Sequence, residues 1–374
     1  MPSAVNTGLV AGATHATVPT ALRGPTPSSR RATDVEDMLR VVLAEGASTS
    51  HALGTGYQRL WRSLTAATEG GKRFRPALFA VGYLAWGGAD DAAAASVAAA
   101  IELLHTAFVV HDDVIDGDDV RRGRLNVSGA HVEEASSAGA APDRARQYGV
   151  AAGILAGDLA LAAALRTVAT CAAPPHTVRR LLDLFDQVLH ATASGELADV
   201  GMSLGTSAPS VEEALVMAER KTGEYSFALP LQAAAVLADA PPAMVLVAGQ
   251  VGRALGTGYQ LMDDLLGVFG DPAATGKSAL SDLRSGKHTA LIAHARGTAA
   301  WPAMAPYVGL ATLSESSAEA VRRLLVASGS RRFVEDLAAH HVDHAIRLGR
   351  EAGMPPALVG WITGMRADLL GRAA

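Results

Sequence analysis

Two clusters of aspartate residues, separated by about 150 positions, are the parts of this sequence best suited to chemistry. The first contains Asp112, Asp113 and Asp116, and the second contains Asp263 and Asp264; each follows an apolar stretch. Aspartates four positions apart lie on one face of a helix, one turn displaced. Several carboxylates beside apolar residues are costly unless a cation offsets their charge, and Mg²⁺, which prefers oxygen ligands, in turn binds phosphates. The clusters therefore predict a magnesium site that grips a diphosphate between two helices.

The first cluster also has a plain structural interpretation, in which carboxylates at a helix end face water. Asp116 to Asp119 fall near the C-terminal end of their helix, where acids oppose the helix dipole, so metal ligation is the better hypothesis. The His111-Asp112 pair resembles that of helical metal phosphohydrolases as well. Such a site needs further histidine ligands, and the sequence does not identify them.

Three groups of cations accompany the aspartates. Arg121 and Arg122 follow the first cluster, residues 71–76 combine a glycine turn with Lys72, Arg73 and Arg75, and Lys221 lies in a Lys-Thr-Gly sequence. Taken alone, each group of cations would be consistent with side chains that are simply exposed to solvent. Beside a metal and diphosphate site they become candidate phosphate ligands, since guanidinium groups bind phosphate oxygens in pairs and helix N-termini attract anions.

Composition narrows the class of protein. The chain has 374 residues, a formal net charge of −5 and only 5% aromatic residues, and its wealth of Ala and Leu favours helices. The negative charge argues against nucleic-acid binding through a basic surface. A single cysteine, Cys171, excludes an intrachain disulfide and fits the cytoplasm. We expect no membrane segment, because the nearest candidate, residues 149–165, is interrupted by Asp158, and no signal peptide.

The periodicity of apolar residues predicts one all-α domain. Residues 1–33 are rich in Ser, Thr, Pro and Gly and are expected to form a disordered leader, followed by a single domain over residues 34–374. Strand signals are almost absent, and residues 123–143 and 271–287 are expected to be loops after the two aspartate clusters. Beyond a first helix near residues 35–43, the predicted helices are 76–87, 90–118, 144–171, 176–204, 210–237, 242–270, 288–297, 314–327, 331–350 and 356–372.

The order of these motifs resembles that of the trans-isoprenyl diphosphate synthase, or polyprenyl synthetase, family. The resemblance spans about residues 34 to 372 and rests on seven motifs in the family's order, at 70–76, 112–116, 121–123, 157–158, 221–223, 259–260 and 263–271. It implies a helical bundle around a deep central cavity and a homodimer. Each motif is moderately specific, whereas the ordered set is highly specific.

The resemblance also implies a role for each matching position. Asp112, Asp113 and Asp116 would hold two Mg²⁺ ions, and Asp263 and Asp264 a third, around the allylic diphosphate. The residues expected to bind the homoallylic diphosphate are Lys72, Arg75, His105 and Arg122. Those expected to bind the allylic diphosphate or line the reaction centre are Arg121, Lys221, Thr222, Gln260, Lys277 and Lys287.

One position departs from the family's pattern. The second motif usually ends in Asp, but position 267 is Gly, which weakens the expected third metal site unless Asp271 compensates through its loop.

The implied reaction is the head-to-tail condensation of isopentenyl diphosphate with allylic diphosphates, most consistently to geranylgeranyl diphosphate. A farnesyl or longer-chain synthase is the alternative within the family. A class I terpene cyclase shares the Asp-rich motif but needs no second diphosphate pocket, so the basic turn at residues 71–75 argues against it. A non-catalytic partner subunit is the third alternative.

Helix geometry suggests where the growing chain would stop. Phe108 and Leu104 lie four and eight positions before Asp112, on the same helical face at successive turns of about 5.4 Å. Ala107 is small where farnesyl-specific members of the family often carry an aromatic residue, which implies room beyond fifteen carbons. Ordinary core packing would give the same residues.

Overall fold

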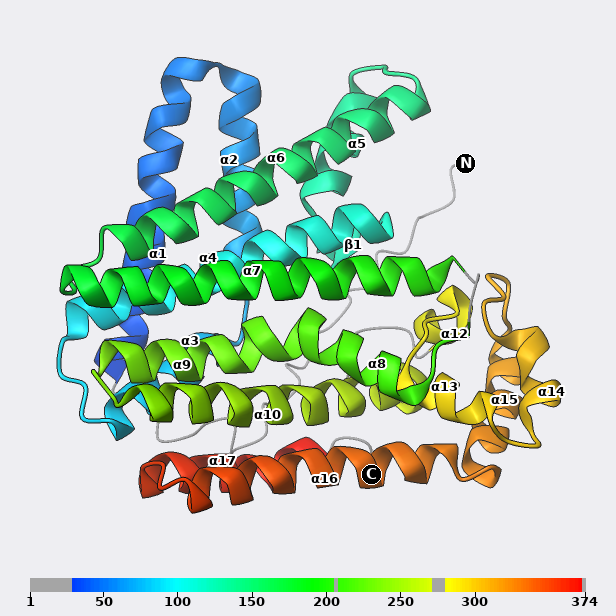
Figure 1. Cartoon of the computed structure of the whole chain (residues 1–374). Coiled ribbons are helices and arrows are strands. Elements are labelled where there is room, and N and C mark those ends of the chain that lie inside the picture. The colour runs from blue at the N-terminus through cyan, green and yellow to red at the C-terminus, as the bar shows by residue number, and fades with distance from the viewer. Residues whose placement is uncertain (1–28, 205–207, 271–279, 372–374) are drawn as a thin grey trace, which may run out of the picture.

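The computed structural model describes residues 29–204, 208–270 and 280–371, and this part of the chain is almost entirely helical, which confirms the all-α prediction (Figure 1). The elements are α1 (Ser29–Ser50), η1 (His51–Leu53), α2 (Thr55–Thr68), α3 (Phe74–Ala85), α4 (Asp91–Asp116), β1 (Val120–Arg121), β2 (Arg124–Leu125), α5 (Val127–Ser137), α6 (Pro142–Ala169), α7 (Pro175–Ser203), α8 (Val211–Ala218), η2 (Glu219–Ala228), α9 (Leu229–Leu237), α10 (Pro242–Phe269), α12 (Ser281–Ser285), α13 (Ala290–Arg296), α14 (Trp301–Met304), η3 (Ala305–Tyr307), α15 (Glu315–Ala327), α16 (Ser330–Glu351) and α17 (Pro356–Leu370).

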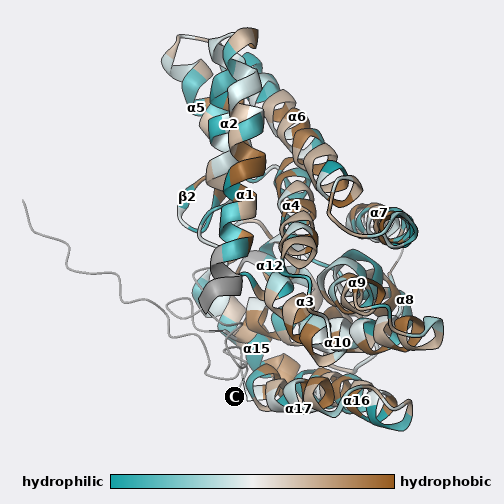
Figure 2. Ribbon diagram, turned by 90° about the vertical axis from the view of Figure 1, so that its left-hand side faces the viewer, coloured by the Kyte–Doolittle hydropathy of each residue, from teal (hydrophilic) through white to brown (hydrophobic). Residues whose placement is uncertain are grey.

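The long helices are stacked in rows around two hydrophobic clusters. Figure 1 shows α7, α9, α10 and α16 running in a similar direction, while the α1–α2 pair projects from one side. The larger cluster joins α4 and α6 to α9 and the first half of α10, and the smaller joins the second half of α10 to α13, α15 and α16. In Figure 2 the hydrophobic residues gather on the helix faces that meet other helices. The middle of α10 therefore lies where the two clusters meet, and its C-terminal end belongs to the smaller cluster.

Close packing of α6 on α4 fixes the last turns of α4. Helix α4 ends at Asp116, because Gly117 adopts a left-handed conformation with φ of 71°. On α6, a Cβ atom added to Gly157 would overlap the imidazole of His111. Only a residue without a side chain leaves room on α6 for the His111 ring. The C-terminal turns of α4, which carry the first aspartate cluster, are thus held against a second long helix.

The predicted helix 210–237 is not a continuous α-helix. Residues Glu219–Ala228 form the π-helix η2 between α8 and α9. Such insertions are rare and occur mostly at functional sites. The η2 backbone packs so tightly on α10 that a Cβ atom at Gly256 would overlap the Cα of Gly223. The prediction missed the π-helix because the apolar residues keep a helical pattern through it.

Two predicted loops contain regular structure, and two α-helices outside them, α2 and the short α14, were not predicted. Residues 123–143 include β2, which pairs antiparallel with β1, and the helix α5, whose first turn is capped by Asn126 accepting a hydrogen bond from the Gly129 N–H at 2.8 Å. Residues 281–285 of the other loop form α12, and residues 55–68 form the unpredicted α2. These elements are short or lack a long apolar stripe, so periodicity alone did not reveal them. The first helix begins at Ser29, inside the expected leader, and residues 1–28 lie outside the described part of the chain.

By length and composition alone, α4 and α6 could each cross a membrane, which the sequence analysis did not anticipate. The apolar stretch of α4 is 78% buried inside the protein, as expected for a core helix, whereas that of α6 is 39% buried. Core helices of globular proteins pass the same test, so these two helices are weak evidence for membrane insertion. The uncovered face of α6 is considered further below.

Arg73 joins three helices near the start of α3. Its Nη1 atom donates to Glu102 Oε1 of α4 and to the Thr68 carbonyl of α2, both at 2.8 Å, and its Nε donates to Glu36 Oε1 of α1 at 2.5 Å. Glu102 is almost fully buried. Of the three cations in the basic turn, Arg73 thus stabilises the packing of α1, α2 and α4.

We predict that Arg73→Ala lowers the free energy of unfolding by about 3 kcal/mol, because it leaves the Glu102 carboxylate buried and unpaired. Arg40, whose ion pair with Asp37 is exposed, is the matched control, and Arg40→Ala should cost less than about 1 kcal/mol. Urea unfolding of both variants measures the difference. Equal losses would show that the Arg73 network has no special role.

Candidate active site

The first aspartate cluster is held by cations from two other elements. Arg121 of β1 donates from Nε to Asp113 Oδ1 at 2.6 Å and from Nη2 to Asp112 Oδ2 at 3.0 Å. Lys221 of η2 places its Nζ atom 3.2 Å from Asp112 Oδ1. Burial raises the pKa of Asp113, although Arg121 opposes this effect. Asp116, one turn further along, is exposed.

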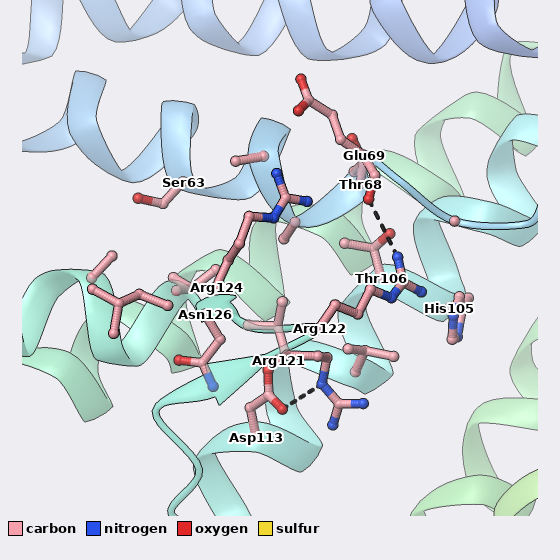
Figure 3. Close-up of a pocket in the computed structure, with 18 of the residues that line it drawn as sticks. Ser63, Thr68, Glu69, His105, Thr106, Asp113, Arg121, Arg122, Arg124 and Asn126 are labelled. Carbon is pink, nitrogen blue, oxygen red and sulfur yellow. Dashed lines mark hydrogen bonds and ion pairs between the residues drawn. The ribbon is translucent and has the colours of Figure 1, made fainter. Parts of the chain in front are cut away.

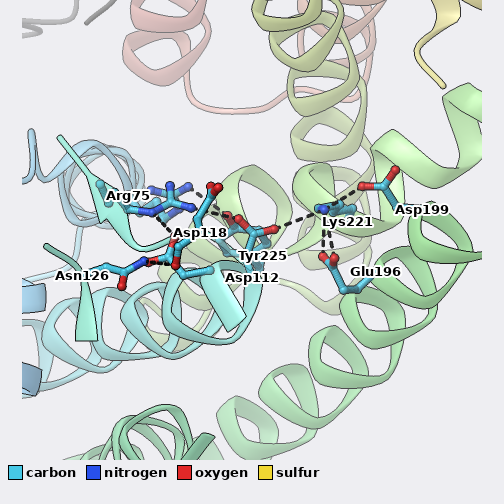
Figure 4. Close-up of polar contacts among 10 residues, drawn as sticks. Arg75, Asp112, Asp118, Asn126, Glu196, Asp199, Lys221 and Tyr225 are labelled. Carbon is cyan, nitrogen blue, oxygen red and sulfur yellow. Dashed lines mark hydrogen bonds and ion pairs between the residues drawn. The ribbon is translucent and has the colours of Figure 1, made fainter. Parts of the chain in front are cut away.

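Lys221 is surrounded by carboxylates that the sequence analysis did not single out. Its Nζ atom lies 2.7 Å from Asp199 Oδ2 and 3.0 Å from Glu196 Oε2, both on α7 (Figure 4). Burial lowers the pKa of Lys221, but the charges of Asp199 and Asp112 outweigh burial and raise it above its ordinary value. Lys221 is therefore a permanent cation. The available signal was the pair of acids three positions apart on a helix.

The second cluster divides into an exposed and a buried carboxylate. Asp263 is exposed, whereas Asp264 is buried and its Oδ1 accepts a hydrogen bond from Gln260 Nε2 at 2.8 Å. Burial raises the pKa of Asp264 to about 7, against the opposing influence of Lys287 and Gln260. Burial lowers the pKa of Lys287, but the charges of Asp264 and Asp282 more than compensate and raise it.

The two clusters belong to one network of charges. The charge of Asp199 acts on both Lys221 and Lys287, and these lysines in turn neutralise Asp112 and Asp264. Carboxylates on α4, α7 and α10 thus face a common region. Carboxylate oxygens are the donors that Mg²⁺ prefers, so the residues present fit the predicted metal.

In the described part of the chain, no three Asp, Glu, His or Cys side chains converge closely enough to bind one metal ion. The side chains of Arg121 and Lys221 hold the first cluster instead. Metal binding would therefore have to rearrange these ion pairs. The same finding gives no support to a histidine-rich phosphohydrolase site, and among the described residues the polar contacts of His111 are with the Ile154 carbonyl and Asp158.

A cavity of about 220 Å³ lies beside the first cluster, between α2, α4, α5 and the β1–β2 hairpin (Figure 3). Its lining brings together four of the predicted site residues, namely His105, Asp113, Arg121 and Arg122. Arg124 adds a further cation that was not predicted, while apolar side chains such as Val110 form the rest of the wall. A small cavity with several guanidinium groups at one side suits an anion attached to an apolar tail.

Lys72 and Arg75, predicted for the same substrate, do not line this cavity. Lys72 is exposed and forms no ion pair with the described residues. Arg75 is held by η2, because its Nη2 donates to Ser226 Oγ at 2.8 Å and its guanidinium lies 4.9 Å from the Tyr225 ring centre. The π-helix therefore orients Arg75 on one side and Lys221 on the other.

His105 is mostly enclosed, and its ring lies parallel to that of Tyr225 at 5.9 Å. Burial, together with the charges of Arg75 and Arg122, holds the pKa of His105 well below its ordinary value, so the ring is neutral near pH 7. Its Nδ1 atom is buried without a hydrogen-bond partner in the described structure. A buried polar atom left unpaired at a cavity wall is a natural position for a ligand contact.

The remaining predicted residues fall in three places. Thr222 is partly buried in η2 beside Lys221. Leu104 and Ala107 are fully buried in the core and do not line the cavity, while Phe108 packs edge-on against Tyr225 at 5.0 Å. Lys277 and Asp271 lie outside the described residues.

Comparison with known proteins identifies the family. Residues 58–308 match the polyprenyl synthetase family. The chain is 33% identical over 293 residues to a (2E,6E)-farnesyl diphosphate synthase of Mycobacterium tuberculosis, covering 76% of this chain and 75% of that protein. It is 31% identical over 310 residues to a geranylgeranyl diphosphate synthase of the same organism, covering 81% and 83%.

The fold is also similar to a crystal structure of geranylgeranyl pyrophosphate synthase from Corynebacterium glutamicum complexed with isoprenyl diphosphate and magnesium. The TM-score is 0.83 with 28% identity, over 90% of this chain and 97% of that one. The helical fold with two Asp-rich helices facing each other is that of an isoprenyl diphosphate synthase. The chain belongs to the polyprenyl synthetase family and is a transferase of the prenyltransferase class.

The state of His105 leads to a prediction about substrate binding. His105→Ala should raise KM for isopentenyl diphosphate about 10-fold or more, because a hydrogen bond to a charged group is lost. His105→Gln, which keeps a neutral donor, should stay within a few-fold of the wild-type KM. Steady-state kinetics on both substrates measures this.

The neutral ring also predicts that this KM shows no titration of His105 between about pH 6.5 and 8, since its pKa is held below that window. A wild-type KM that rises through this range, with the change absent in His105→Gln, would contradict a neutral donor.

Proposed function

We propose that this prenyltransferase condenses isopentenyl diphosphate head-to-tail with dimethylallyl, geranyl and farnesyl diphosphates, and that its main product is all-trans geranylgeranyl diphosphate. The observation that carries the proposal is the placement of an arginine-lined cavity directly beside the first of two carboxylate clusters that share a network of charges. The reaction needs a place for each of two diphosphates, and this arrangement supplies two chemically different ones.

The allylic diphosphate is assigned to the region between the clusters. We propose that each site binds three Mg²⁺ ions. They would be held on one side by Asp112, Asp113 and Asp116, and on the other by Asp263 and Asp264. When bound, magnesium would neutralise the charge that develops on the departing pyrophosphate. The cations assigned to the same diphosphate are Arg121, Lys221, Lys277 and Lys287, with Thr222 beside them.

The chain's own residues would orient these groups. Gln260 fixes the Asp264 carboxylate by its hydrogen bond at 2.8 Å, and Glu196 and Asp199 hold Lys221 toward Asp112. Once metal binding has rearranged the ion pairs of the first cluster, these partners would hold Lys221 and Asp264 in position as charge develops.

The homoallylic diphosphate is assigned to the cavity side of α4. His105 and Arg122 line the cavity, Arg75 is positioned by Tyr225 and Ser226, and the exposed Lys72 can move toward a ligand. The apolar wall would keep water away from the reacting carbon atoms. The proton lost in the condensation is assigned to the released pyrophosphate.

The alternatives differ in what they require. A farnesyl or longer-chain synthase would use the same site, so only product length separates it from the proposal. A class I terpene cyclase has no use for the arginine-lined cavity beside the first cluster. A non-catalytic subunit would not need both carboxylate clusters and their cations.

We also propose that the protein is a cytoplasmic homodimer. Exposed apolar side chains are numerous on α6 (Tyr148, Val150, Ile154 and Leu155) and at the end of α7 (Leu197, Val200 and, just after the helix, Leu204). Exposed apolar side chains are common at protein interfaces, and a second copy of this chain would cover them.

Incubating the purified chain alone with Mg²⁺, isopentenyl diphosphate and each allylic primer, followed by chromatography of the dephosphorylated products, tests the function. Geranylgeraniol as the main alcohol supports the proposal, and farnesol or longer alcohols support the alternatives within the family. A cyclic hydrocarbon, or no product without a partner, would overturn it.

Both carboxylate clusters should be required for turnover. We predict that Asp112→Ala and Asp263→Ala each lower kcat about 100-fold or more, because each removes a carboxylate needed when charge develops on the leaving group. Asp336→Ala, at an exposed position of α16, is the control and should retain activity. Near-normal turnover of a folded Asp263→Ala enzyme would show that the second cluster binds no metal.

Product length should depend on the α4 residues behind the site. Phe108→Ala removes an aromatic ring that packs on Tyr225 and should shift the products toward longer chains. Ala107→Phe should shorten them toward farnesyl diphosphate. Because Ala107 is fully buried, Ala107→Leu provides a milder change in the same direction if the larger variant does not fold. Folded, active variants with unchanged product lengths would place the chain-length determinant elsewhere.

A further inference from the structure

Lysine is scarce in this chain and confined to the predicted substrate site. Only four of the 32 Lys and Arg residues are lysines, so arginine carries nearly all the positive charge elsewhere. The two residues differ in reactivity, because a lysine amine can lose its proton and be acylated, whereas an arginine guanidinium stays protonated. The side chains that acylation can modify are therefore few, and all of them were predicted to bind diphosphate: Lys72, Lys221, Lys277 and Lys287.

Two of these lysines are held by carboxylates. The Nζ atom of Lys221 lies within 3.2 Å of three carboxylates. Burial lowers the pKa of Lys221 and of Lys287, but neighbouring carboxylates outweigh burial and raise both pKa values. Only a neutral amine attacks an acyl group, and each unit by which its pKa rises lowers the neutral fraction about 10-fold. Neither lysine is therefore a good nucleophile.

Lys72 is in a different environment. Of the three lysines in the described part of the chain, it alone is exposed, and its side chain forms no ion pair with the described residues. It lies in the turn between α2 and α3, where Gly70 adopts a left-handed conformation with φ of 73°. Lys72 is thus the described lysine that is best placed to react with a reagent from the solvent.

Two guanidinium groups of the β1–β2 hairpin lie beside this turn. A Cβ atom added to Gly70 would stand 3.5 Å from Arg124 Nη2 and 4.0 Å from Arg122 Nη1. Figure 3 shows both side chains directed toward the end of α2, where Arg122 donates to the Glu69 carbonyl at 3.3 Å. Because guanidinium groups bind phosphate oxygens, a small phosphate compound would be held here within reach of the flexible Lys72 side chain.

We propose that Lys72 is a site of covalent acylation by small acyl phosphates, such as acetyl phosphate, which Arg122 and Arg124 guide to it. The Lys72 nitrogen attacks the acyl carbon, the bond from that carbon to the phosphate oxygen breaks, and inorganic phosphate leaves with the electron pair. The amine proton passes to water, and the product is a neutral amide. Acylation therefore removes a positive charge from the homoallylic side of the site. This consequence rests on the proposed function, whereas the place of reaction does not.

Acetylation of the purified chain by acetyl phosphate, followed by mass spectrometry, tests the place of reaction. Cleavage after glutamate puts Lys72 and Lys221 in separate peptides, 70–102 and 220–224. Lys72 should be acetylated about 10-fold or more faster than Lys221 and Lys287, since the pKa of each of these two is raised. No acetylation of Lys72, or reaction at Lys221 or Lys287 at the same rate or faster, would overturn the proposal.

A neutral acylating reagent separates guidance by the arginines from simple exposure. Arg124→Ala should slow the reaction of Lys72 with acetyl phosphate several-fold and leave its reaction with the uncharged N-hydroxysuccinimide ester of acetic acid unchanged. High salt should have the same selective effect, because it screens the attraction between exposed charges. Arg332→Ala, which removes an exposed arginine of α16, is the matched control and should change neither rate. Equal effects of Arg124→Ala on the two reagents, or no effect on either, would overturn guidance by the arginines.

Kinetics links the modification to substrate binding. Enzyme acetylated at Lys72 should show KM for isopentenyl diphosphate raised about 10-fold or more, because a hydrogen bond to a charged group is lost. Isopentenyl diphosphate present during acetylation should protect Lys72. The Lys72→Arg variant keeps the charge and has no amine at this position, so acetyl phosphate should leave its KM at the value of the untreated variant.

The outcomes separate this inference from the function on which its consequence rests. Selective acetylation of Lys72 with an unchanged KM would support the acylation site and contradict the assignment of Lys72 to the homoallylic diphosphate. Unselective acetylation of an enzyme that makes prenyl diphosphates would overturn the acylation site alone.

Discussion

The repulsion among carboxylates is the constraint on which the rest of this structure depends. Asp113 and Asp264 are buried, and Asp112, Glu196 and Asp199 lie close to them, so like charges are concentrated in a region with little water. Such a concentration is stable only if cations from elsewhere in the chain neutralise it. Arg121, Lys221 and Lys287 do this, and each comes from a different element. A site of this kind is expected to be less stable than its surroundings when no metal or diphosphate is bound, because ligands supply charge that the protein alone balances imperfectly.

The architecture follows from the need to bring these elements to one place. Glycines let α6 pack on the His111 side chain near the end of α4 and let the η2 backbone approach α10, so close helix packing, and not charge alone, positions the two aspartate helices. The π-helix then presents Lys221 toward the first cluster and Tyr225 and Ser226 toward Arg75. One local departure from α-helical geometry thus serves the proposed positions of both substrates, in keeping with the usual location of π-helices.

Much of the site could be predicted from the sequence because its chemistry is local. The aspartates of the Asp112 and Asp263 clusters lie within about one helical turn of one another, so their spacing can be recognised in the sequence. Apolar periodicity predicted the bounds of most long helices to within a few residues. What could not be predicted depends on contacts between distant segments. Nothing local distinguishes Arg73, which joins α1, α2 and α4, from the exposed Lys72. Glu196 and Asp199 can be recognised as two acids on one helix, but the sequence does not show that Lys221 is their partner. The π-helix was not predicted because its apolar pattern resembles that of an α-helix.

The central claim is that α4 and α10 form one metal and diphosphate site. Crystals grown with Mn²⁺ in place of Mg²⁺ and with inorganic pyrophosphate would test it by anomalous diffraction, since Mn²⁺ accepts the same oxygen ligands. The account predicts anomalous peaks beside Asp112 and Asp116 and a further peak beside Asp263, with one pyrophosphate bridging them. Peaks confined to one helix, or a pyrophosphate bound by the cavity arginines with no metal beside it, would contradict the claim.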